Sequence, residues 1–65
     1  MIQLQAINYI LNTKDFSIVT LNNLNSDFFS DYKEEFNFIQ QHYSTYGNVP
    51  DKETFIDKFR NFDFL

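Results

Sequence analysis

Two residues that interrupt helices stand close together in this chain of 65 residues, and they are its one glycine and its one proline, Gly47 and Pro50. Glycine and proline disfavour helix interiors more than any other residue types, so the rest of the sequence is free to be helical. The sequence therefore predicts a single all-α domain over residues 1–65, folded as a small orthogonal bundle of about four helices.

Two short helices are expected in the first third of the chain. Apolar residues recur at three- and four-residue spacing over residues 2–12, which predicts a helix with one buried stripe. Asp15 or Ser17 is placed to cap a second helix that runs to Leu24. The side chains expected to face the core are Leu4, Ile7, Ile10, Leu11, Ile18, Leu21 and Leu24.

The clearest helical pattern precedes Gly47. Asp31 and Glu34 have the spacing of a capping box, which predicts the start of this helix. Gly47 is placed to take the left-handed conformation that commonly ends a helix. Its core stripe is expected to consist of Tyr32, Phe36, Ile39, Tyr43 and Tyr46, which alternate between four- and three-residue spacing.

A fourth helix is expected after Pro50. Asp51 is placed to cap it, and Phe55, Phe59 and Phe62 continue the helical spacing. The last residues are apolar and carry no helix stop signal or polar tail. We therefore expect the sequence to be cut from a longer protein.

The chain has nine Phe and four Tyr, more large rings than so small a fold is expected to hide. Phe38 points about 200° away from Phe36 around the helix, so it packs against a second layer, the favoured interpretation, or meets a partner. Apolar residues near the C-terminus either cover their own core or contact another chain. The candidate protein-protein contacts are Phe38, His42, Phe62, Phe64 and Leu65.

The composition disfavours most chemistry. A formal net charge of −4 has the wrong sign for binding a phosphate backbone, and one glycine cannot form a phosphate-binding loop. His42 is interpreted as a surface or partly packed histidine rather than a catalytic base. We expect no catalytic residue, cofactor site, metal site, direct nucleic-acid contact or membrane span, and the absence of cysteine fits a cytoplasmic protein.

Short motifs follow one another along nearly the whole chain. In order they are Gln5-Ala6-Ile7 with Ile10-Leu11, Leu21 and Leu24, Asp27-Phe28-Phe29, Phe36 and Ile39, Tyr46-Gly47, and Pro50-Asp51 with Thr54-Phe55. This order resembles the N-terminal domain of DnaB-type replicative DNA helicases. The chain departs from that family at Leu4, where an acidic residue is common, and at Lys33-Glu34-Glu35, where a basic residue is common. The resemblance therefore points to a divergent or phage-type member.

The resemblance implies a non-catalytic collar domain that self-associates, as a hexameric ring in the full-length parent, and docks primase or a helicase loader. By this resemblance, residues 1–65 would be the N-terminal fragment of a longer helicase chain, and ATP and Mg²⁺ would belong to a C-terminal motor that lies outside these residues. The expected location is the cytoplasm of a bacterium or a phage-infected bacterium. The alternatives are a stand-alone small acidic phage protein that modulates a replication protein, and an unrelated helical interaction domain.

Overall fold

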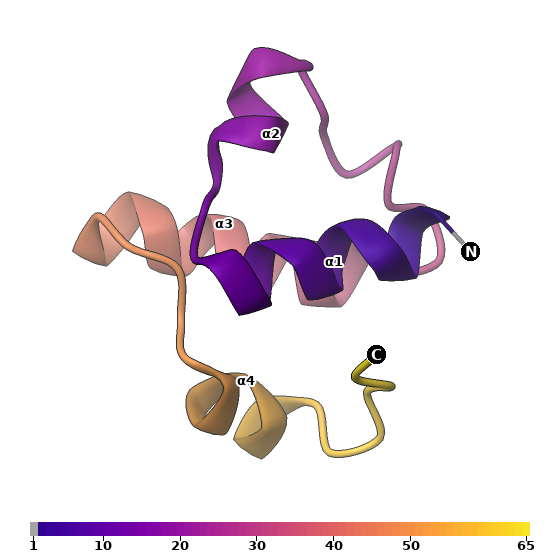
Figure 1. Cartoon of the computed structure of the whole chain (residues 1–65), viewed down its shortest axis with the longest axis vertical. Coiled ribbons are helices and arrows are strands. Elements are labelled where there is room, and N and C mark those ends of the chain that lie inside the picture. The colour runs from indigo at the N-terminus through magenta and orange to yellow at the C-terminus, as the bar shows by residue number, and fades with distance from the viewer. Residues whose placement is uncertain (1) are drawn as a thin grey trace.

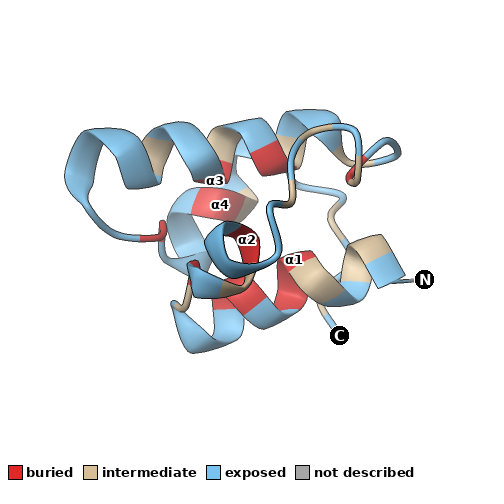
Figure 2. Ribbon diagram, turned by 90° about the horizontal axis from the view of Figure 1, so that it is seen from above, coloured by how far each residue is buried: buried red, intermediate tan, exposed pale blue. Residues whose placement is uncertain are grey.

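The structure is a computed structural model that describes residues 2–65, and within that range it contains four helices and no strand. The helices are α1 (Ile2–Thr13), α2 (Ser17–Leu21), α3 (Lys33–Tyr46) and α4 (Lys52–Lys58). Helices α1 and α3 form two stacked layers, and α2 and α4 cover opposite flanks of this pair (Figures 1 and 2). The predicted small all-α bundle is confirmed.

Aromatic rings form the centre of the core. The ring of Phe36 stacks on Phe29 at 4.4 Å between centroids and lies 6.4 Å from Phe16. The buried residues lie mainly on the parts of the helices that are turned toward one another (Figure 2). The buried hydrophobic residues are Ile7, Ile10, Leu11, Phe16, Val19, Phe29, Phe36, Ile39, Val49 and Phe55.

The second helix is shorter than predicted. Asp15, not Ser17, supports its start, because the Asp15 carboxylate accepts a hydrogen bond from the Ser17 N–H at 2.9 Å. The helix ends at Leu21, whose side chain is 80% exposed, so its predicted place in the core is wrong. Val19 is the buried residue of α2, and a residue two positions later lies about 200° around a helix. The side chain of Leu21 therefore points to solvent.

The start of α3 also differs from the prediction. Tyr32 is the N-cap residue and makes no side-chain capping bond, so the Asp31 and Glu34 capping box is wrong. The Gln3 side chain of α1 contacts this segment instead. Its Oε1 accepts a hydrogen bond from the Asp31 N–H at 2.9 Å, and its Nε2 donates to the Ser30 hydroxyl at 3.3 Å. A side chain distant in sequence thus holds the segment that leads into α3.

The predicted core stripe of α3 holds for its first half only. Phe36 and Ile39 are buried, but Tyr43 is partly exposed and Tyr46 is 68% exposed. The C-terminal end of α3 extends past the end of α1 (Figure 1), so the last turn has no layer to pack against. The expectation that Tyr46 faces the core is therefore wrong, although the Tyr43 ring still stacks on Phe16 at 4.6 Å.

The turn after α3 and the start of α4 agree with the prediction. Gly47 has a φ of 76°, and its N–H donates to the Tyr43 carbonyl at 2.8 Å. The Asp51 carboxylate caps α4 by accepting a hydrogen bond from the Thr54 N–H at 2.8 Å. Helix α4 ends at Lys58, before the predicted Phe62 position. The Phe62 ring nevertheless lies 4.9 Å from Phe55, because a turn rather than a helix brings it there.

Candidate functional site

The structure places the five predicted contact residues in two separate regions. Phe38 and His42 line an open groove between α3 and α4. Phe62 and Phe64 are half-buried and pack against the core, and Leu65 beside them is 68% exposed. The five residues thus do not form one surface. Each region is built from different elements and has a different chemistry.

The groove consists of three adjoining hollows of about 530, 410 and 400 Å³. The first and second share His42, Tyr46 and Thr54, and the second and third share Phe38 and Gln41. Helix α3 forms one wall, and α4 with the residues before and after it forms the other. We call this feature the α3–α4 groove. Its lining residues are Lys14, Glu34, Asn37, Phe38, Gln41, His42, Thr45, Tyr46, Asn48, Val49, Asp51, Thr54, Lys58 and Phe59.

Phe38 lies in the part of the groove shared by two hollows. Its ring centroid lies 5.7 Å from Phe59 and 6.2 Å from Phe55, both in edge-to-face geometry. Phe36, two residues earlier, stacks in the central core on the other side of α3. The expected packing of α3 on two sides is therefore confirmed, and part of the Phe38 ring remains open to the groove.

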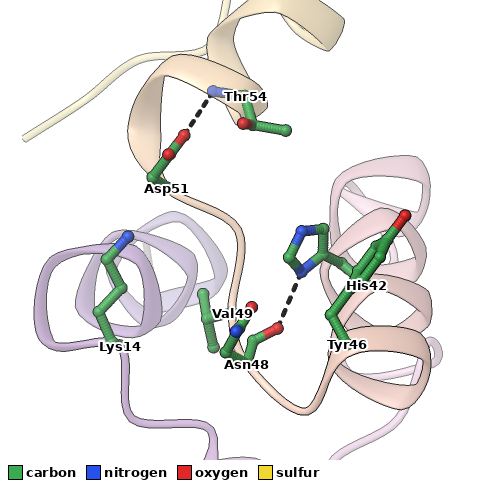
Figure 3. Close-up of a pocket in the computed structure, with 7 residues that line it drawn as sticks. All are labelled: Lys14, His42, Tyr46, Asn48, Val49, Asp51 and Thr54. Carbon is green, nitrogen blue, oxygen red and sulfur yellow. Dashed lines mark hydrogen bonds between the residues drawn. The ribbon is translucent and has the colours of Figure 1, made fainter.

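His42 is held at one end of the groove by the turn after α3. Its Nδ1 lies 2.8 Å from the carbonyl oxygen of Asn48, an acceptor, so Nδ1 carries the proton and donates (Figure 3). Its ring also packs against Tyr46 at 4.6 Å between centroids. These two contacts fix the imidazole as a wall of the groove.

The charged groups at this end also have local partners. The Lys14 ammonium donates to the Pro50 carbonyl at 3.3 Å. The Thr54 N–H that bonds to the Asp51 carboxylate lowers the pKa of that carboxyl, and the charge of Lys14 adds a smaller effect in the same direction. Figure 3 shows both side chains around the opening of the hollow. The Lys14 bond thus links the end of α1 to the turn before α4, and the Asp51 bond lies within the start of α4.

At this end of the groove, Lys14, His42 and Asp51 use hydrogen-bonding atoms in bonds to helix ends and turns. Within residues 2–65 no three histidine, aspartate or glutamate side chains lie close enough together to hold a metal ion. In the same range no helix has the length and apolar character needed to cross a membrane.

The second region contains a residue that the sequence analysis did not identify. Asn8 on α1 is only 3% exposed, and its carboxamide bonds to the backbone of Asp63 and Leu65. The available signal was its place in the apolar spacing of α1, since it lies between Leu4 and Leu11 on the predicted core stripe. A polar residue at such a position requires a buried hydrogen-bonding partner.

No family model, curated protein or solved structure matches this chain at a significant level. The resemblance to the N-terminal domain of DnaB-type helicases therefore rests on the order of motifs in the sequence.

Proposed function

We propose that this chain is a non-catalytic docking and assembly domain, the N-terminal collar of a divergent DnaB-type replicative helicase. In this role it self-associates and presents the α3–α4 groove to primase or to a helicase loader in the bacterial cytoplasm. ATP hydrolysis would reside in a C-terminal motor on the same polypeptide. The order of motifs from Gln5 to Phe55 supports the family, and the groove supports docking.

The α3–α4 groove is the observation that carries the docking proposal. Its aromatic lining comes from Phe38, Phe59 and Tyr46, and between these rings lie neutral polar side chains such as Gln41 and Thr45. The charged lining residues Lys14, Asp51, Glu34 and Lys58 belong to the two outer hollows, and the middle hollow has no Lys, Arg, Asp or Glu. The centres of protein interfaces are likewise enriched in aromatic residues and depleted of charged ones. The composition therefore favours a protein partner.

The dimensions of the groove fit a short segment of a partner. It follows α3 from Glu34 to Tyr46, and a helix rises about 1.5 Å per residue, so the groove extends for roughly 18 Å. That length accommodates about three turns of a helix. The net charge of −4 disfavours nucleic acid as the occupant and favours a partner with basic residues beside its apolar contacts.

A binding experiment with the primase and the helicase loader of the same genome tests the docking role. We expect the chain to bind at least one of them, and Gln41→Arg to weaken binding about tenfold or more, because it places a long charged side chain in the groove. Asn12→Arg, an equal charge change at an exposed position of α1, is the matched control and should leave binding unchanged. Failure to bind either protein, or equal effects of the two substitutions, would contradict the proposal.

The gene itself separates the collar from a stand-alone regulator. A reading frame that continues past the codon for Leu65 into a phosphate-binding loop would support the collar. A stop codon directly after Leu65 would contradict it and direct the search to host replication proteins. ATP hydrolysis by the isolated 65-residue chain would contradict the non-catalytic assignment.

A further inference from the structure

Asn8 binds the polypeptide backbone of residues 63–65 through both ends of its carboxamide. Its Nδ2 donates to the Asp63 carbonyl at 3.2 Å and to the Leu4 carbonyl at 3.0 Å, and its Oδ1 accepts from the Leu65 N–H at 2.9 Å. The Asp63 carbonyl and the Leu65 N–H face the same carboxamide, as the C=O of one peptide group and the N–H of the next face one neighbouring strand in a sheet. The Asn8 side chain thus takes the place of a neighbouring peptide group.

Aromatic contacts make this backbone site selective for a segment that carries the rings of Phe62 and Phe64. The Phe62 ring lies 4.9 Å from Phe55 and 6.1 Å from Tyr32, and the Phe64 ring lies 6.1 Å from Phe55. Phe55 is fully buried, and Phe62 and Phe64 form part of its cover. Asn8, Tyr32 and Phe55 therefore form a receptor for the segment 62–65, which we call the closing segment.

The connection between α4 and the closing segment is short and exposed. Helix α4 ends at Lys58, and a turn follows in which the Phe62 N–H donates to the Phe59 carbonyl at 3.1 Å. Arg60 and Asn61 in this turn are exposed, and among residues 2–65 no side-chain hydrogen bond anchors either of them. Rotation at these two residues would release the closing segment without unfolding any helix.

An open receptor would be unfavourable in water. Release of the segment exposes Phe55 and removes two of the three hydrogen bonds of the Asn8 carboxamide. The same segment from a second copy of this chain would restore every one of these contacts, since it is identical in sequence. Exchange of a segment between identical chains is a low-cost route to association.

We propose that two copies of this chain associate by exchanging their closing segments, each seated on the Asn8, Tyr32 and Phe55 receptor of the other. The proposal rests on the self-association in the proposed function, and it names the surface and the occupant. In a single chain the short connection gives the segment a high effective concentration, so closure within one chain dominates in dilute solution. Exchange between chains becomes more favourable relative to closure within one chain when the copies are held close together, as in a ring.

The first test changes the length of the connection. Deletion of Arg60 and Asn61 removes up to about 7 Å of reach, so the segment can no longer close on its own chain. We expect this variant to be a dimer by light scattering at protein concentrations where the unaltered chain is mainly monomeric. Insertion of Gly-Ser between the same two residues is the matched control and should shift the population toward monomer. A deletion variant that keeps its helical circular dichroism and remains monomeric would overturn the proposal.

The second test mixes two defective chains. Asn8→Leu removes the receptor and keeps the segment, whereas Phe62→Ser with Phe64→Ser removes the segment's rings and keeps the receptor. Each variant alone should be monomeric, and an equimolar mixture should form a heterodimer, because one chain still supplies an intact segment and the other an intact receptor. Absence of a heterodimer at millimolar concentration, with both variants helical, would overturn the exchange.

The two tests separate this proposal from the proposed function. If the unaltered chain self-associates but neither connection length nor mixing changes the mass, another surface carries the association and only the exchange fails. If the unaltered chain and all variants remain monomeric up to about 1 mM, the concentration scale of short-linker closure, the exchange and the self-association both fail.

Discussion

Aromatic side chains line the α3–α4 groove and also form the closing segment, but the backbone that carries them is held differently in the two regions. In the groove, Phe38 is half-buried, and Tyr46 stands 68% exposed at the end of a helix that extends past its neighbours. In the closing segment, Phe62 and Phe64 turn inward, because the backbone beside them is bonded to a buried side chain, Asn8. The comparison teaches that aromatic content does not identify a free surface. Half-buried rings occur in both regions, and what differs is how the adjoining backbone is held: by its own helix at Phe38, and by the distant Asn8 side chain at Phe62 and Phe64.

The largest expected effect is at Phe55, the residue that joins the two regions. Its ring lies 6.2 Å from Phe38 on the groove side and 4.9 Å from Phe62 on the other side. We expect Phe55→Ala to lower the free energy of unfolding by about 3–5 kcal/mol, the usual cost of removing a buried ring. Urea denaturation measures the change. A loss below about 1 kcal/mol would mean that the two regions are not coupled through this ring.

The next largest effect is expected at Asn8, and the same substitution at a groove residue compares the two regions directly. Asn8→Leu keeps the size of the side chain but leaves the Asp63 carbonyl and the Leu65 N–H without their partner, so we expect a loss of about 1–3 kcal/mol in the free energy of unfolding. Asn37→Leu makes the same chemical change at an exposed position that lines the groove, and it should change the free energy of unfolding by no more than about 0.5 kcal/mol. Equal effects of the two substitutions would show that the hydrogen bonds of Asn8 do not hold the closing segment.

A smaller effect concerns pH at the groove end. The pKa of Asp51 is lowered in the folded chain because its carboxylate accepts a hydrogen bond from the Thr54 N–H. The carboxylate therefore adds stability that is complete above the unfolded pKa of about 3.9 and is lost as pH falls through the lower, folded pKa. We expect Asp51→Asn, which keeps the cap but cannot titrate, to make the melting temperature fall less between pH 5 and pH 3. Identical pH profiles for both proteins would contradict this contribution.

The smallest expected effect is at Lys14, where α1 ends beside the groove. Lys14 has a φ of 62°, a left-handed conformation that glycine adopts without strain. We expect Lys14→Gly to raise the free energy of unfolding by up to about 1 kcal/mol, reduced by loss of the bond to the Pro50 carbonyl. Lys14→Ala loses the same bond and keeps the strained backbone, so it should be less stable than Lys14→Gly. The reverse order in thermal melts would contradict the interpretation.

Local signals were sufficient where the relevant contacts lie within a few residues. Gly47 and Asp51 act on their own helix ends, so sequence spacing alone located the end of α3 and the start of α4. The capping box at Asp31 and Glu34 failed because Gln3, distant in sequence, binds that segment. Of the candidate contacts, Phe38 and His42 were found together in the groove, since they lie one turn apart on the same helix.

The sequence alone determined the all-α class, the breaks at Gly47 and Pro50, and the burial of Phe36, Ile39 and Phe55, because helix propensity, turn chemistry and apolar spacing act over short distances. Only the tertiary structure decided which aromatic residues are covered. The exposure of Tyr46 follows from where α1 ends, and the backbone beside the half-buried Phe62 and Phe64 is held by Asn8, more than fifty residues earlier. Those contacts form between segments far apart in the sequence, and the local pattern of either segment does not indicate the other.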